Sequence, residues 1–162
     1  MDFRCPDCGT LLPRGVPSWV RRLTVADAMT RDPLTLGPED TLMGGLEVMR
    51  KRGIRRIPIV IGDALVGLLA EGDLKRAQPS TLSESQDDFN RVMEETQVAR
   101  IMIQRPVTVT PETPLLEAAR TLQAMKYGGL PVVDTVSGTT VVGILTDTDL
   151  VGVLGDLLMQ GG

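Results

Sequence analysis

Two stretches of this chain, GLLAEGDL at residues 67–74 and GILTDTDL at residues 143–150, are variants of one phrase. In each, a glycine and a run of apolar residues lead to an Asp-Leu ending, a pattern that predicts a buried strand followed by a helix. One difference affects the chemistry, because Thr146 of the second copy stands where the first copy has Ala70. The similarity extends outward from both stretches, so most of the chain is an internal repeat.

A shift of 73 residues displays the repeat. It aligns VADAMTRDPLTLGPEDTL at 25–42 with VARIMIQRPVTVTPETPL at 98–115 and gives eight identities in 18 positions. Each copy predicts the order β-α-β-β-α: an extended piece such as VTVT at 107–110, a helix that starts at Pro-Glu, two short strands and a second helix. We therefore expect an α+β fold in which two β-α-β-β-α repeats pack through their sheets, since a unit of about 55 residues buries little core alone.

The same alignment predicts how the chain is divided. The predicted segments are an N-terminal arm at 1–19, a first repeat at 20–77, a polar connector at 78–97, a second repeat at 98–156 and a C-terminal tail at 157–162. The connector is expected to be partly helical, with Phe89, Val92 and Met93 facing inward.

Composition narrows the classes of function. Hydrophobic residues make up 42% of the 162 residues and aromatic residues only 2%, so the core must be aliphatic. The net charge of −4 and the scarcity of aromatic side chains argue against a nucleic-acid partner, although five cations are concentrated at 50–56. The chain has no histidine for catalysis, and no apolar run is long enough to span a membrane. We expect a cytoplasmic protein with no membrane partner and no enzymatic activity.

The ordered motifs resemble the cystathionine β-synthase (CBS) domain in its tandem form, over residues 25 to about 153. The matching phrases are DAMTRDP, PEDT and PETP before the first helices, RRIPIV and GGLPVV on the strands, and GLLAEGDL and GILTDTDL at the second helices. The chain is also similar to small stand-alone bacterial CBS pairs of the acetoin-utilisation regulator type. The resemblance implies a pseudo-two-fold disc with a cleft on each side, where AMP, ADP, ATP or S-adenosylmethionine binds. It further implies a homodimer and an unidentified regulated partner protein.

Thr146 and Asp149 have two interpretations. Thr-x-x-Asp before an apolar run is typical of a capping box, in which the two side chains bind the first amides of a helix. A helix start also presents unpaired N–H groups and a positive dipole end, which suit a phosphate. The resemblance favours a nucleotide site, with Asp149 on the ribose diol, Thr146 near the phosphate, and the base pocket in YGGLPVV at 127–133. The further residues that it places at nucleotide sites are Tyr127, Gly128, Gly129, Leu130, Pro131, Thr113 and Asp73.

Arg55 and Arg56 stand where the second repeat has a pair of glycines. In one interpretation they are solvated charges, favoured near the C-terminal end of a helix by its dipole. In the other they reach the shared cleft and bind phosphate oxygens, which arginine does bidentately. Because Ala70 cannot cap a helix and Thr146 can, we expect one competent nucleotide site per chain rather than two.

The arm contains Cys5 and Cys8 within CPDCGT, the form of a zinc-ribbon knuckle. A structural zinc site usually needs four ligands, so this pair is half a site, which a second chain, Asp2 or Asp7 would complete. A redox pair and an unmetallated remnant are the alternatives. Zinc shared between chains would make the arm a dimer clasp.

Three hypotheses for the function follow. In the first, the chain is a regulatory module that binds an adenosine nucleotide and acts on a partner protein. In the second, it is a constitutive oligomerisation or interaction scaffold without a ligand. In the third, the cysteine knuckle docks to a protein or to RNA.

Overall fold

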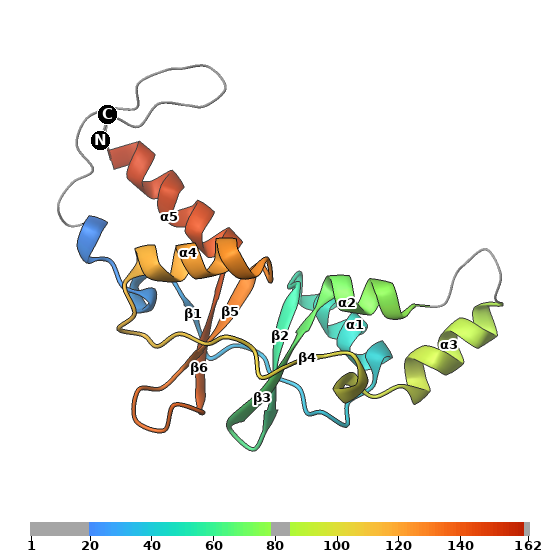
Figure 1. Ribbon diagram of the computed structural model, residues 1–162. Coiled ribbons are helices and arrows are strands. Elements are labelled where there is room, and N and C mark those ends of the chain that lie inside the picture. Colours follow the sequence, from blue (N-terminus) through green and yellow to red (C-terminus); the bar gives the residue numbers. More distant parts are fainter. Residues whose placement is uncertain (1–19, 79–84, 161–162) are drawn as a thin grey trace.

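The computed structural model describes residues 20–78 and 85–160, and its element order confirms the predicted repeat (Figure 1). The first repeat consists of β1 (Thr30–Arg31), α1 (Leu42–Arg52), β2 (Arg56–Ile61), β3 (Ala64–Ala70) and α2 (Glu71–Ala77). The second consists of β4 (Ile103–Gln104), α4 (Leu115–Met125), β5 (Gly129–Val133), β6 (Val141–Thr146) and α5 (Asp147–Gln160). Between them lies α3 (Gln86–Glu95), and short 3-10 turns occupy Val20–Arg22, Val25–Asp27 and Val98–Arg100.

The first helices of the two repeats end at corresponding residues. α1 starts after Thr41, whose hydroxyl accepts a hydrogen bond from the Gly44 amide at 3.1 Å, and it ends at Gly53, which has a left-handed φ of 65°. α4 ends in the same way at Lys126, with a φ of 58°. Glycine adopts this conformation freely and lysine does so only with some strain. In both repeats this residue stops the helix and turns the chain toward the next strand.

The strands form two antiparallel three-stranded sheets, in the orders β1-β6-β5 and β2-β3-β4. The first strand of each repeat therefore pairs with the other repeat, β1 with β6 and β4 with β3. The extended piece predicted over VTVT at 107–110 pairs only through an isolated parallel bridge between Val109 and Val132, in which the Val133 amide donates to the Val109 carbonyl at 2.9 Å, so it is not a full strand. The two-residue β4 joins the sheet instead.

The segments before these short strands also cross between the repeats. The Val25 amide donates to the Thr113 carbonyl at 2.9 Å, and the Val98 amide, 73 residues later, donates to the Asp40 carbonyl at 2.7 Å. Both valines are fully buried, each in the apolar cluster of the other repeat. Neither repeat closes its core with its own residues alone.

The core consists of two aliphatic clusters. Their buried members are Leu, Ile, Val, Met and Ala, and no polar or charged side chain is buried among the described residues. α4 and α5 cover the sheet that contains β5 and β6, and α1 and α2 cover the other sheet (Figure 1). The sheets meet through their hairpins, where the Val141 amide donates to the Asp63 carbonyl at 3.1 Å. Within the described ranges, no helix has the length and apolar character needed to cross a membrane.

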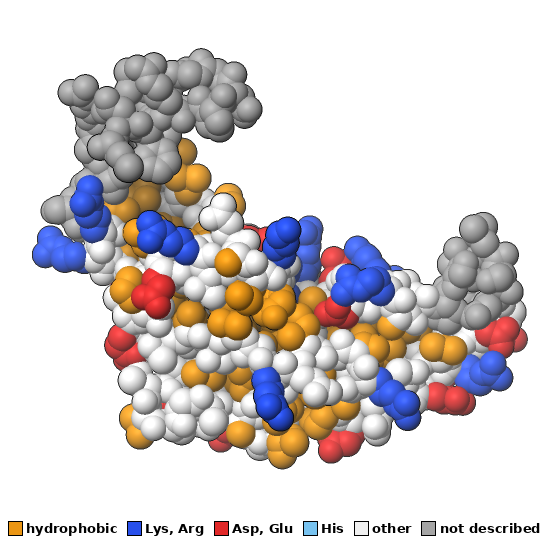
Figure 2. All heavy atoms as spheres, in the orientation of Figure 1, with side chains coloured by type: hydrophobic (Ala, Val, Ile, Leu, Met, Phe, Trp, Pro, Cys, Tyr) orange, Lys and Arg blue, Asp and Glu red, His pale blue; other side chains and the backbone are white. Residues whose placement is uncertain are grey.

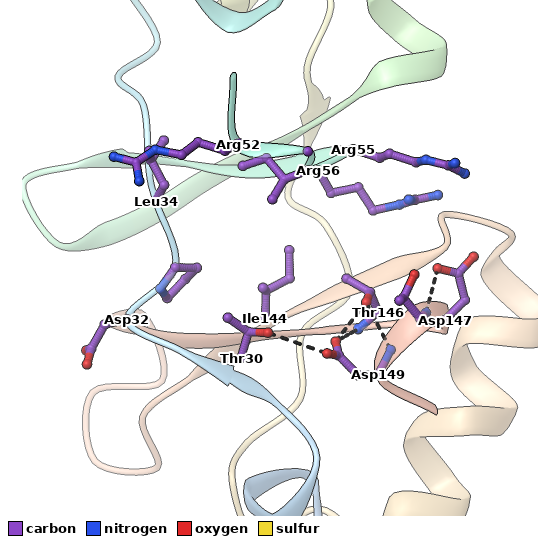
Figure 3. A pocket seen from close by; sticks show the side chains of 14 residues that line it. Thr30, Asp32, Leu34, Arg52, Arg55, Arg56, Ile144, Thr146, Asp147 and Asp149 are labelled. Carbon is purple, nitrogen blue, oxygen red and sulfur yellow. Dashed lines mark hydrogen bonds between the residues drawn. The ribbon is translucent and has the colours of Figure 1, made fainter. Parts of the chain in front are cut away.

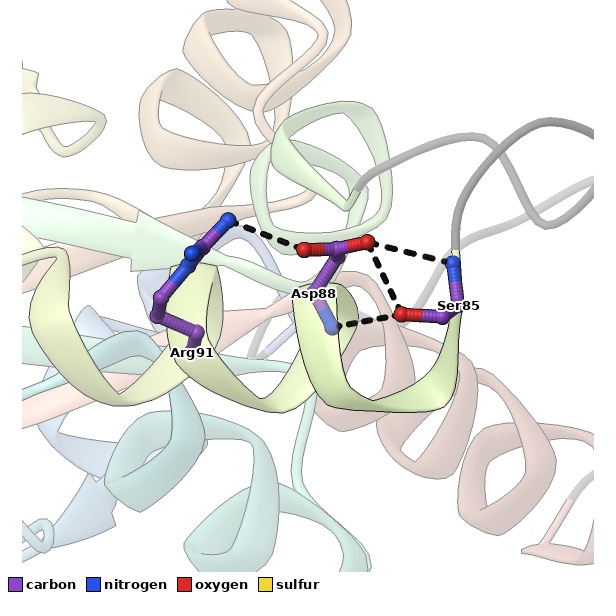
Figure 4. A network of polar contacts seen from close by, with 3 residues as sticks. All are labelled: Ser85, Asp88 and Arg91. Carbon is purple, nitrogen blue, oxygen red and sulfur yellow. Dashed lines mark hydrogen bonds and ion pairs between the residues drawn. The ribbon is translucent and has the colours of Figure 1, made fainter.

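α3 packs against α1 at the outer side of the first repeat. Its Met93 is fully buried, and Phe89 is half-buried against the same cluster. A capping box holds the start of the helix: the Ser85 hydroxyl accepts from the Asp88 amide at 3.2 Å and donates to the Asp88 carboxylate at 2.8 Å (Figure 4). Arg91 binds the other oxygen of this carboxylate at 2.9 Å.

Candidate functional site

A pocket of about 920 Å³ opens between the two repeats (Figure 3). Its walls come from residues within 30–34, in β1 and the segment after it, within 52–56, where α1 turns into β2, and within 144–149, where β6 joins α5. The pocket thus brings the tip of a helix in the second repeat opposite a basic turn in the first.

Thr146 and Asp149 form a capping box at the start of α5. Oδ2 of Asp149 accepts hydrogen bonds from the Thr146 amide and from the Thr146 hydroxyl, both at 2.7 Å. The hydroxyl in turn accepts from the Asp149 amide at 3.4 Å. The capping interpretation is therefore confirmed. The other oxygen, Oδ1, has a long contact of 3.4 Å with the Thr30 hydroxyl, which is weak for a hydrogen bond between oxygens.

The start of α5 is better suited to hydroxyl groups than to a phosphate. Its first amides have partners, since Asp147 N–H donates to the Gly128 carbonyl at 3.3 Å and Thr148 N–H donates to Asp147 Oδ1 at 3.0 Å. Two carboxylates, Asp147 and Asp149, lie in the same turn and would repel an anion. The chemistry of this wall is that of a hydrogen-bond acceptor.

The opposite wall is basic, with Arg52, Arg55 and Arg56. Figure 3 shows Arg55 and Arg56 extending toward the side of the pocket where Asp147 lies, while Arg52 extends toward Leu34 on the other side. None of the three arginines is in an ion pair with another described residue. Arg52 and Arg55 are exposed and Arg56 is half-buried, so all three line the pocket with charge that solvent can reach.

Arg56 is held by the second repeat. Its Nε donates to the carbonyl of Tyr127, and its side chain lies so close to Gly128 and Gly129 that a Cβ at either position would overlap it. Gly128 has a φ of 67°, a conformation that favours glycine. The two glycines thus make room for an arginine from the first repeat.

The positive field of this wall reaches Glu71 in the first turn of α2. A hydrogen bond with Lys75, 3.0 Å away, lowers the pKa of Glu71 below its ordinary value of 4.5, and the nearby charges of Arg55 and Arg56 act in the same direction. A negatively charged group placed closer to the two arginines would be stabilised by the same attraction.

Between the polar walls the pocket is apolar. Pro33, Leu34 and Ile54 are half-buried, and Ile144 is buried at the floor. A binding pocket of this kind typically combines an apolar lining with a few polar groups that fix the orientation of the ligand. The aliphatic lining can hold a flat heterocycle, while the carboxylate and the arginines can orient its polar substituents.

Residues 127–133, which the sequence predicts as the base pocket, do not line this larger pocket, and their contact with a base stays a prediction. Leu130 and Pro131 are buried inside β5, and Gly129 pairs with Thr146 in the sheet. Gly128 lines a separate pocket of about 450 Å³ between α4 and α5. Gly128 and Gly129 do adjoin the tip of α5, since the Asp147 amide donates to the Gly128 carbonyl, but the side chain of Arg56 packs against both glycines.

Two further predicted residues also lie elsewhere. The Thr113 hydroxyl accepts a hydrogen bond from the Thr110 amide at 3.0 Å in the turn before α4, outside the larger pocket. Asp73 is in α2, where one carboxylate oxygen pairs with Arg76 and the other is buried without a hydrogen-bond partner among the described residues. Neither residue joins Thr146 and Asp149 in one site.

The sequence pattern did not lead us to predict the apolar wall formed by Leu34 and Ile54. The repeat held the necessary signal, because Ile54 and Arg55 correspond to Tyr127 and Gly128 under the shift of 73 residues. The prediction placed the base pocket and the helix tip in one repeat, whereas the apolar wall of the larger pocket and the tip of α5 come from different repeats.

Cys5 and Cys8, predicted as half of a zinc site, lie outside the described residues. Within the part of the chain that is described, no group of three or more His, Cys, Asp or Glu side chains is placed to hold a metal ion.

Comparison with known protein families finds the CBS domain twice in this chain, over residues 25–80 and 98–156. Each match covers one of the two repeats. The family assignment therefore agrees with the fold.

Three solved structures are similar to the chain. An acetoin utilization protein (AcuB) from Vibrio cholerae is 33% identical, with a TM-score of 0.69 over 85% of this chain and 93% of that one. CBSX2 from Arabidopsis thaliana, in complex with AMP, is 28% identical, with a TM-score of 0.68 over 83% and 97% of the two chains. The CBS domain pair of protein MJ0100, in complex with 5′-methylthioadenosine and S-adenosyl-L-methionine, is 25% identical, with a TM-score of 0.68 over 83% and 97%.

Proposed function

The chain belongs to the CBS domain family, with one copy of the domain in each repeat, and on this premise we propose that it is a regulatory module whose pocket binds an adenosine nucleotide. The observation that carries the proposal is the placement of three arginines opposite Asp149 across an apolar pocket. The adenosine compounds bound to CBSX2 and to the MJ0100 pair support it.

The pocket suggests how such a ligand is oriented. The purine lies between Leu34 and Ile144, where aliphatic side chains exclude water from its faces. The ribose lies over Asp149, whose Oδ1 accepts a hydrogen bond from the diol in place of its weak contact within the protein. The phosphate then points toward Arg55 and Arg56 (Figure 3).

The charges of the pocket favour a phosphate-bearing ligand over S-adenosylmethionine. Arg55 and Arg56 offer a phosphate charge-assisted hydrogen bonds, which are stronger than those between neutral groups. The sulfonium of S-adenosylmethionine carries a positive charge, which the same two guanidinium groups would repel. We therefore expect AMP, ADP or ATP to bind more tightly than S-adenosylmethionine.

We propose one such site per chain. In the first repeat the helix α2 begins after Ala70, which has no side-chain hydroxyl to cap it. Asp73, the counterpart of Asp149, is already paired with Arg76. The backbone of Gly128, which corresponds to Arg55, is covered by Arg56. The two halves have thus taken different roles, with the ribose acceptor in one and the phosphate charges in the other.

A ligand held in this way would bridge the two repeats, because its phosphate contacts the first and its ribose contacts the second. Binding then favours the arrangement in which both walls are close, and a partner protein can respond to that arrangement. The shift requires that the ligand bind the two arrangements with different affinity. The homodimer and the zinc clasp stay predictions.

Arg55→Gln tests the assignment of the phosphate wall. Loss of the guanidinium charge should weaken AMP binding about 10- to 100-fold, since a hydrogen bond to a charged group contributes roughly 1.5–3 kcal/mol. Adenosine, which has no phosphate, should bind the wild type and the variant alike. Isothermal titration calorimetry with both ligands measures these affinities.

Arg50→Gln is the matched control, because Arg50 belongs to the same basic cluster at the end of α1 but does not line the pocket. It should bind AMP as the wild type does. Equal AMP affinity in Arg55→Gln and Arg50→Gln would show that the arginine wall holds no phosphate. If no adenosine compound binds the wild type, the ligand-free scaffold replaces the proposal.

A further inference from the structure

Lys126 ends α4 in a backbone conformation that disfavours lysine. Its φ is 58° and its ψ is 20°, in the left-handed region. The counterpart in the first repeat, 73 residues earlier, is Gly53, with a φ of 65°. Glycine would therefore suit this turn better than lysine does. Residues held in such conformations cluster at ligand sites, so the surroundings of Lys126 indicate what its side chain does.

The smaller pocket, of about 450 Å³, is lined by Lys126 and by Gln123 from the same end of α4. Arg56 and Asp147 line this pocket and the larger one alike, so the two pockets adjoin at these residues. Aliphatic side chains of α4 and α5 form the rest of its side-chain lining. The smaller pocket is therefore a continuation of the larger one, past the side chain of Arg56.

The charged groups of the smaller pocket suit an anion. Lys126 and Arg56 provide two cations, and Asp147 provides one carboxylate. Neither cation is in an ion pair with a carboxylate of the described ranges. Figure 2 shows basic side chains gathered where the end of α4 faces the first repeat. The side-chain amide of Gln123 adds an uncharged donor. A guanidinium, an ammonium and an amide together offer the donors that the oxygens of a phosphate chain accept.

A nucleotide held as proposed above would direct its phosphate toward this pocket. Its first phosphate lies against Arg55 and Arg56, on the side of the larger pocket where Asp147 lies (Figure 3). Because Arg56 and Asp147 also line the smaller pocket, any phosphate beyond the first continues into it. AMP would end before the smaller pocket, whereas ADP and ATP would extend into it.

On the premise that the larger pocket holds an adenosine nucleotide, we infer that the smaller pocket receives the β- and γ-phosphates of ADP or ATP. Lys126 is then the residue that determines the preference for these ligands over AMP. Its ammonium group acts as a point charge on the distal phosphates, which a glycine at this turn does not supply. Asp147 opposes the phosphates, but the two cations outnumber it.

Isothermal titration calorimetry with AMP, ADP and ATP measures this preference. The titrations are done in EDTA, so that no metal ion neutralises the phosphates. The wild type should bind ATP about 10-fold more tightly than AMP, as expected for one added hydrogen bond to a charged group. Lys126→Gly and Lys126→Gln should each weaken ATP binding about 10-fold and leave AMP binding unchanged.

Lys126→Gly also separates ligand binding from a structural role, because a cation at the end of a helix stabilises the helix dipole. Glycine suits the left-handed turn, so the urea midpoint of this variant should equal or exceed that of the wild type. Lys51→Gln is the matched control for the loss of charge. Lys51 is exposed in the last turn of α1 and lines neither pocket, so all three affinities should stay unchanged.

The titrations distinguish failure of this inference from failure of the nucleotide site. AMP binding without a preference for ADP or ATP would overturn the inference and leave the nucleotide site intact, as would ATP affinity that is unchanged in both Lys126 variants. Equal weakening of AMP and ATP binding by Lys126→Gly would also overturn it, because the lysine would then act on the whole site. If the wild type binds none of the three nucleotides, both proposals are wrong.

Discussion

Arg56 is the residue that joins the two halves of the site. It starts β2 in the first repeat, lines the larger pocket, and donates to the carbonyl of Tyr127 in the second repeat. Its side chain fits because Gly128 and Gly129 have no Cβ to oppose it. The position of one guanidinium group therefore depends on two glycines that are more than 70 residues away in the sequence.

Gly128→Ala should destabilise the protein by about 2.5–5 kcal/mol. A left-handed conformation disfavours alanine by roughly 1–2 kcal/mol, and the displaced Arg56 loses a hydrogen bond of a charged group, which contributes about 1.5–3 kcal/mol. Urea unfolding measures the change. Gly62→Ala is the control, because Gly62 has a similar φ of 61° and open space around it. Equal destabilisation by the two variants would mean that the Arg56 contact contributes nothing.

Single residues could be predicted from the sequence where they interact with residues nearby in the chain. Thr146 and Asp149 lie three residues apart, and that spacing is sufficient to specify a capping box. Arg55 and Arg56 line the pocket between the repeats, as one of the two interpretations of the sequence expects, and their contact with a phosphate stays a prediction. Leu34 and Ile54 were not predicted to line the pocket, because the type of an apolar residue in a turn does not indicate which distant segment it will contact.

At the scale of elements, the helices were easier to predict than the strands. The Pro-Glu signals and the apolar spacing predicted α1 and α4, since capping and amphipathic packing are local properties. β1 and β4 have only two residues each, too few for an alternating pattern. Their pairing is fixed by hydrogen bonds to the other repeat, so the local pattern of VTVT at 107–110 misplaced the strand.

The capping box at Ser85 and Asp88 should stabilise α3 in its packed position against α1. The side-chain hydrogen bond from Ser85 is the main cause that lowers the pKa of Asp88 below 3.8, and the Ser85 amide and the charge of Arg91 add to it. A lowered carboxyl pKa means that the stabilisation is present above about pH 4 and is lost as the pH falls through the lowered value. Asp88→Asn should therefore speed amide hydrogen exchange in α3 at pH 7 and have little effect once the pH is below the lowered pKa of Asp88.

Ser85→Ala provides a second measure, because loss of an N-cap side chain typically costs about 1 kcal/mol. It should speed exchange in α3 more than in α4, whose start has no side-chain cap. Exchange in α3 that is as slow in both variants as in the wild type, at every pH, would contradict a role for the box.

At the scale of the whole molecule, the repeats form one structure because each supplies part of the core of the other. Val25 and Val98 are fully buried across the boundary, and the lead strands pair across it. The number and order of the elements followed from the internal repeat. The exchange of the lead segments did not, since nothing within one repeat distinguishes pairing with itself from pairing with its copy. That exchange is also why the two walls of the pocket come from different repeats.

A crystal structure of the full chain with AMP tests the central proposal most directly. We predict one AMP per chain, with its purine beside Leu34 and Ile144, its ribose on Asp149 and its phosphate against Arg55. AMP bound instead beside Asp73 and Tyr127, or the arginines turned to solvent while protein side chains fill the pocket, would contradict it.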